Sequence, residues 1–146
     1  MRLIAYLTIK YLAYAAWCFI GMQLSLSTLR ATLARALGLG LLRLLLGLMF
    51  GVVIYLLGSI VYSALVELPA TGLLTYLAVY VPVRWVEWSL IAMLIAPASR
   101  SFSLFWIGMN SRDRLWRCGG ILVSCIADIP MIIALGGILP VGRFLC

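Results

Sequence analysis

Apolar residues fill this chain in four long runs, which short polar stretches separate. The runs cover about residues 3–26, 39–68, 71–96 and 118–139. Each is long enough to cross a bilayer, because a spanning α-helix needs about 20 predominantly apolar residues. The pattern predicts an all-α integral membrane protein with four transmembrane helices, forming one transmembrane domain over residues 1–146.

The polar stretches between the runs differ in character. In residues 27–38, leucines recur at every fourth position and arginines lie off that line. This spacing predicts a short interfacial amphipathic helix, with a cap at Ser27 or Thr28 and an end at Gly38. Residues 98–117 form an extended polar stretch, and we predict that they are a loop at the membrane surface.

Two residues bear on whether the first and third runs are regular membrane helices. Lys10 lies in the first run, where its long side chain is expected to snorkel towards the nearer membrane surface. Pro82 lies midway along the third run and leaves two interpretations open. The run is either one continuous helix or a pair of half-helices that meet at Pro82, which requires protein or water around the break.

Composition supports a membrane location. Of the 146 residues, 66% are hydrophobic and 10% are charged, against about 45–50% and about 25% in soluble domains. The formal net charge of +7 would suggest nucleic acid in a soluble protein. Here the arginines lie between apolar runs, so the positive-inside rule and anionic lipid headgroups explain them, and nucleic acid is a disfavoured partner.

The distribution of these cations predicts an orientation. Arginines concentrate between runs one and two and between runs three and four, whereas the turn at Pro69 has none. Both hairpin loops are therefore expected to be cytoplasmic, with the Pro69 turn and both termini outside. The dominance of arginine over lysine favours a bacterial inner membrane.

Charged residues within the runs are the strongest functional signal. Arg84 and Glu87 lie near the middle of the third run, and Asp128 lies near the middle of the fourth. Each costs about 2.5–3.5 kcal/mol at the centre of a membrane helix, so they should face the interior and pair, with Tyr80 on the same side. Two acids against one arginine predict a surplus negative charge. The alternatives are a structural network, an ion or proton path, and contact with a partner's charge.

Glycines in the second run predict close helix packing. Gly47 and Gly51 form a G-x-x-x-G pair, and Gly40 and Gly58 lie seven residues to either side of it. Small residues allow membrane helices to approach closely. The partner helix belongs either to the same bundle or to another subunit.

A basic cluster precedes the fourth run. Arg112, Arg114 and Arg117 lie in the predicted cytoplasmic loop. The cluster is interpreted either as a topology determinant that binds anionic lipid or as a docking site for an acidic cytoplasmic partner.

No sequence motif names a reaction. The chain has no histidine and no C-x-x-C pair, so neither a metal site nor a catalytic site is predicted, and the sequence specifies no cofactor. We expect a non-catalytic subunit of a larger membrane assembly, made with other membrane proteins or with copies of itself. The alternative is a small oligomeric channel or transporter in which Glu87 or Asp128 binds a proton or cation.

Overall fold

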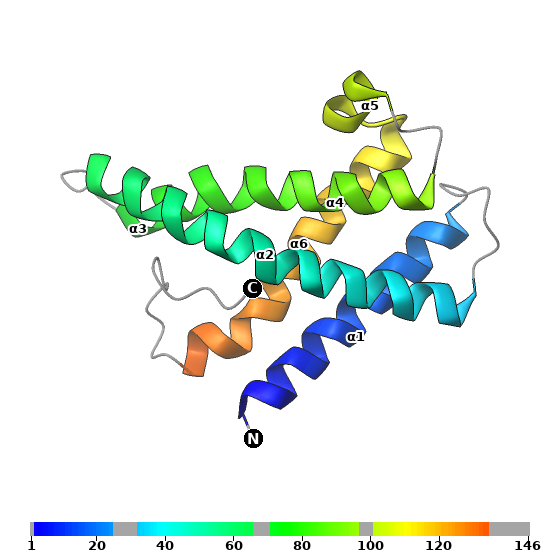
Figure 1. The fold of residues 1–146 in the computed structure, drawn as a ribbon, viewed down its shortest axis with the longest axis horizontal. Helices are drawn as coiled ribbons and strands as arrows, with labels where there is room; N and C mark the ends of the chain where they lie inside the picture. Colours follow the sequence, from blue (N-terminus) through cyan, green and yellow to red (C-terminus); the bar gives the residue numbers. More distant parts are fainter. Residues whose placement is uncertain (1, 25–31, 66–70, 97–100, 135–146) are drawn as a thin grey trace.

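The computed structural model describes residues 2–24, 32–65, 71–96 and 101–134, and all regular structure in these ranges is helical (Figure 1). The elements are α1 (Arg2–Gln23), α2 (Leu33–Ala64), α3 (Thr71–Thr75), the π-helical segment η1 (Tyr76–Tyr80), α4 (Val81–Ile95), α5 (Phe102–Ile107) and α6 (Ser111–Ala134). In these ranges, three helical stretches are long and apolar enough to cross a membrane: Ile4–Gln23, Leu33–Ala64 and Thr71–Ile95.

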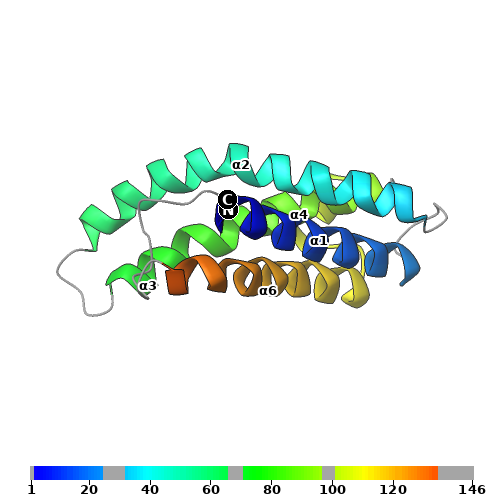
Figure 2. The same ribbon diagram turned by 90° about the horizontal axis from the view of Figure 1, so that it is seen from below.

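The long helices form a closed ring. Helix α1 packs against α2 and α6, and α4 packs against the same two helices from the opposite side. Neighbouring helices run antiparallel, so the end of α1, the start of α2, the end of α4 and the start of α6 gather at one end of the bundle (Figure 2). The short helix α5 lies beside the start of α6 at this same end (Figure 1). We call this end of the bundle the arginine end, because Arg35, Arg112 and Arg114 are exposed there.

Helix α2 begins before the second apolar run and replaces the predicted interfacial helix. Residues 33–38 are its first turns, and Thr32 is the N-cap whose hydroxyl accepts a hydrogen bond from the Arg35 backbone N–H. A separate helix over 27–38 is therefore wrong, and the predicted caps Ser27 and Thr28 lie outside the described residues. Gly38 does not end the helix, because an interior glycine costs only about 1 kcal/mol.

The third run is one continuous helical stretch from Thr71 to Ile95, so the interpretation as two half-helices at Pro82 is wrong. The segment η1 directly precedes α4, which carries Pro82 in its first turn. In a π-helical turn, carbonyls bond to N–H groups five residues ahead. Proline has no N–H to donate to the preceding turn, and this widened turn allows the helix to continue although that hydrogen bond is missing.

The fourth run begins earlier than predicted. Helix α6 begins at Ser111, and the stretch predicted to be a loop over 98–117 contains α5 and the first turns of α6. Gly108 makes the turn between these two helices, with a φ of 82° that favours glycine. The predicted end of the run, beyond residue 134, lies outside the described residues.

Four of the five glycines of α2 lie on its buried face, which is directed into this chain's own bundle. This face contains Gly40, Gly47, Gly51 and Gly58. At Gly40 the backbones come so close that an added Cβ would lie 2.8 Å from the Cα and N of Ala15 in α1. The stripe therefore serves packing within the chain.

We expect Gly40→Ala to destabilise the bundle by about 1–3 kcal/mol, because the methyl group would push the α1 and α2 backbones apart. Gly38→Ala is the matched control, since no atom lies within 4 Å of its added Cβ. This control should be neutral or stabilising by up to about 1 kcal/mol. Unfolding by SDS in detergent micelles, followed by circular dichroism, measures both. Equal stability of the two variants would contradict the close approach at Gly40.

Candidate functional site: a buried charge network

Among the described residues, seven charged side chains lie buried inside the bundle. They are Lys10, Arg43, Arg84, Glu87, Asp113, Arg117 and Asp128. Arg43 lies ten residues inside α2, which corresponds to about 15 Å along the helix. Since the hydrocarbon core of a bilayer is about 30 Å thick, this charge lies deep within a candidate span.

Asp128 is held by side chains from two other elements. Lys10 Nζ of α1 lies 2.5 Å from its Oδ1, and the Tyr6 hydroxyl donates to the same oxygen at 2.6 Å. The Tyr80 hydroxyl of η1 donates to Oδ2 at 2.5 Å. The prediction that Lys10 snorkels to the membrane surface is therefore wrong. Lys10 is 0% exposed, because α6 places the Asp128 carboxylate within its reach inside the bundle.

Glu87 is held by two arginines. Its Oε2 accepts a hydrogen bond from Arg84 Nη1 at 2.6 Å, one turn earlier on α4, and forms an ion pair with Arg43 Nη2 from α2. All three side chains are fully buried. This arrangement ties α2 to α4 through a carboxylate that carries two cations.

Aromatic and hydroxyl groups surround the Arg43 guanidinium. Its Cζ lies 4.7 Å from the centroid of the Tyr14 ring and 5.1 Å from that of Trp88. Its Nη2 donates to Ser124 Oγ at 3.4 Å, and the Trp88 Nε1 donates to the same oxygen at 3.3 Å. Cation–π contact stabilises a desolvated guanidinium by about 2 kcal/mol. Arg43 thus contacts groups from α1, α4 and α6 in addition to Glu87.

The two halves of the network meet at Tyr80. The Arg84 Cζ lies 4.6 Å from the centroid of the Tyr80 ring, whose hydroxyl bonds to Asp128. The four residues singled out in the sequence, Tyr80, Arg84, Glu87 and Asp128, therefore lie together. Sequence reasoning missed Lys10 and Arg43, although both interrupt apolar runs as the others do.

These two residues overturn the predicted charge balance. Lys10, Arg43 and Arg84 face Glu87 and Asp128. Three cations against two acids leave a surplus positive charge, so the predicted surplus negative charge is wrong. The chain supplies its own counter-charges, because two further cations come from α1 and α2.

Some polar atoms around Glu87 have no hydrogen-bond partner among the described protein atoms. They include Glu87 Oε1, the Nε and Nη1 of Arg43 and the Tyr14 hydroxyl. An unsatisfied buried polar group costs about 1–3 kcal/mol. These unsatisfied atoms therefore reduce the net stabilisation that the network gives to the bundle.

The predicted basic cluster divides into an exposed part and a buried part. Arg112 and Arg114 are exposed in the first turn of α6, but Arg117 is 0% exposed. Arg117 donates from Nε and Nη2 to Asp113 at 3.1 and 2.8 Å, and from Nη1 to Ser89 Oγ at 2.8 Å. Its inclusion in a lipid-binding or docking surface is therefore wrong, because it instead joins α6 to α4.

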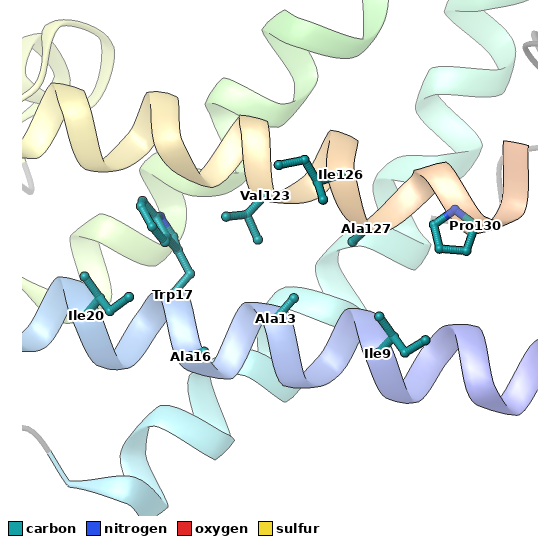
Figure 3. A pocket seen from close by; sticks show the side chains of 9 residues that line it. All are labelled: Ile9, Ala13, Ala16, Trp17, Ile20, Val123, Ile126, Ala127 and Pro130. Atoms are coloured by element: carbon teal, nitrogen blue, oxygen red, sulfur yellow. The ribbon is translucent and has the colours of Figure 1, made fainter.

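An apolar groove lies between α1 and α6 on the outside of the ring (Figure 3). Its volume is about 450 Å³. The lining side chains are Ile9, Ala13, Ala16, Trp17, Ile20, Val123, Ile126, Ala127 and Pro130. Beside it, the indole N–H of Trp17 donates to the Trp116 carbonyl at 3.0 Å, and that of Trp116 donates to the Trp17 carbonyl at 3.1 Å. These reciprocal bonds fix the two walls.

Comparison with known proteins identifies no relative of this chain. No protein-family model, no curated protein and no solved structure matches the chain. The fold and the network define the class: an all-α protein whose described residues contain three candidate membrane spans and a charged core.

Proposed function

We propose that this chain is a four-span protein of a bacterial inner membrane, with the arginine end in the cytoplasm. Helix α6 would be the fourth span, because it closes the ring with α1 and α4 and directs Asp128 inwards while Leu122 and Ile126 face outwards. The exposed arginines of the described residues lie in the first turns of α2 and α6, which begin at the same end of the bundle (Figure 2). The positive-inside rule then favours a cytoplasmic location for this end.

In this membrane, the chain would act as a non-catalytic subunit of a larger assembly. The observation that carries this proposal is the uncovered length of α2. Its 32 residues span about 48 Å, and at an average tilt of about 20° they exceed a 30 Å hydrocarbon core by half. Apolar side chains are exposed from Leu33 at 69% to Ile60 at 65%. The exposed apolar side chains on the part of α2 that extends beyond the hydrocarbon core are more stable against another protein than in water.

The C-terminal half of α2 is the favoured contact surface. Between residues 52 and 64, only Ile54 and Gly58 are buried, and Ile54 packs against η1 and the start of α4. The exposed side of this half also carries the hydroxyl groups of Tyr55, Ser59 and Ser63. Such residues pack and form hydrogen bonds between membrane helices.

The charge network favours a subunit over a cation channel. Glu87 and Asp128 are each ion-paired with a cation from another helix. The surplus charge around these two acids is positive, and it would repel a transported cation. The groove between α1 and α6 is lined by apolar side chains and an indole. The core charges therefore serve to join helices, and the exterior remains available for association.

A native-mass determination after gentle detergent extraction tests this proposal. Co-purifying foreign chains would support it and identify the assembly, whereas a homo-oligomer without foreign chains would favour the oligomeric channel or transporter. A monodisperse single copy, free of partners, would overturn it. The chain should be extracted from its own cells so that natural partners are present.

Ser59→Trp should weaken the assembly about tenfold to a hundredfold, because the indole would be forced into a packed contact that costs about 1–3 kcal/mol. Leu122→Trp is the control, since Leu122 is 63% exposed on α6, away from this surface. Native mass and circular dichroism should show dissociation of the Ser59 variant with unchanged helicity. Equal dissociation of both variants would place the contact elsewhere.

A further inference from the structure

The groove between α1 and α6 has the length of one bilayer leaflet. Its α1 wall runs from Ile9 to Ile20, eleven residues or about 16 Å. One leaflet of hydrocarbon is about 15 Å thick. Ile20 lies three residues before the end of α1 at Gln23, so the groove begins just below the arginine end and extends to the middle of the bundle.

The width of the groove fits a hydrocarbon chain. A volume of 450 Å³ over about 16 Å corresponds to an average width of about 6 Å. The narrow floor results from Ala13, Ala16 and Ala127, and the rim carries larger side chains such as Ile126 (Figure 3).

A cation stands above the groove on the same helix face. Arg112, Gly119, Val123, Ile126 and Pro130 follow one another at spacings of seven, four, three and four, which places them on one side of α6. Val123, Ile126 and Pro130 line the groove, and Arg112 is exposed. Arg112 lies seven residues, about 10 Å, above Gly119, whose added Cβ would touch the groove-lining Trp17 ring.

We propose that this groove holds one acyl chain of an anionic phospholipid, with the lipid phosphate at Arg112. The guanidinium supplies charge-assisted hydrogen bonds to the phosphate oxygens. The approximately 10 Å between Arg112 and the top of the groove accommodates the glycerol and ester region. The leaflet is the one at the arginine end of the bundle.

Native mass spectrometry of the purified full chain with phosphatidylglycerol or phosphatidylcholine tests the site. The wild type should retain one phosphatidylglycerol through delipidation and bind it at least fivefold more tightly than phosphatidylcholine, because one basic residue near an anionic headgroup supplies about 1 kcal/mol. Arg112→Gln should remove this preference. Arg114→Gln, two residues away on another side of α6, should keep it.

A second variant tests the acyl-chain part separately. Ala16→Leu fills the groove floor from an exposed position and should reduce binding of both lipids about tenfold. Ala5→Leu, exposed on the same helix outside the groove, should have no effect. Circular dichroism of both variants confirms that the helices remain folded.

Two outcomes would overturn the site. One is equal retention of the two lipids that neither Arg112→Gln nor Ala16→Leu changes. The other is an Ala16→Leu variant that loses oligomeric mass and leaves lipid binding intact, which would assign the groove to a helix of another chain. Neither result bears on the assembly proposed for α2, because that surface lies on a different helix.

Discussion

Replacing Glu87 by alanine should prevent stable folding of the bundle. The substitution leaves Arg43 and Arg84 buried without the carboxylate that both contact, and the core then holds three cations against Asp128 alone. Breaking a buried ion pair by removing one partner costs about 3–5 kcal/mol, and here two pairs are lost at once. Since many proteins are stable by only about 5–15 kcal/mol, we expect little folded protein in detergent, measured by SDS unfolding and by accumulation in membranes.

Glu87→Asp is the matched control. It keeps the charge and removes one methylene, so one arginine contact should persist and the loss should be about half as large. Wild-type stability of the Glu87→Ala variant would show that the arginines do not depend on this carboxylate. The control separates charge from shape, because alanine removes both.

The second large effect is expected at Asp128. Asp128→Asn removes the counter-charge of Lys10 and keeps one oxygen, which can accept from only one of the Tyr6 and Tyr80 hydroxyls, because these now donate to different oxygens. We expect the free energy of unfolding to fall by about 3 kcal/mol, because the ammonium group remains buried without its partner. Reversible SDS unfolding in mixed micelles measures the change.

The double variant Lys10→Met/Asp128→Leu tests the cause. Apolar replacement of a whole buried pair is often neutral or stabilising, so this variant should recover most of the stability that Asp128→Asn loses. If the double variant is as unstable as Asp128→Asn, the unpaired Lys10 charge does not cause the loss of stability. The hydrogen bonds of Tyr80 would then be the next group to test.

The apolar runs predict the helical class of the fold because each helix is visible within its own segment. The all-α class and membrane-length apolar helices are confirmed. Element boundaries were less predictable: Gly38 lies inside α2, and α6 begins at Ser111. In both places polar residues continue a helix, and local pattern alone does not distinguish a helix that continues from one that stops at the membrane surface.

The membership of the charge network was only partly predictable. Depth along the helix identifies Arg84, Glu87 and Asp128, since each lies near the middle of its run. Lys10 and Arg43 lie nearer the ends of theirs, so each has an apparent route to the surface. Their burial depends on which helices are neighbours, and that information comes from tertiary packing between residues as distant as Lys10 and Asp128.

The ion pair between the first and the last described helix imposes an order on the synthesis of this protein. Lys10 precedes its carboxylate by 118 residues, and at about 5–20 residues per second a ribosome needs about 6–24 s to make them. During that interval the nascent first helix carries an ammonium group whose counter-charge has not yet been made. A chain that terminates before Asp128 therefore keeps Lys10 without the carboxylate that pairs with it in the finished bundle.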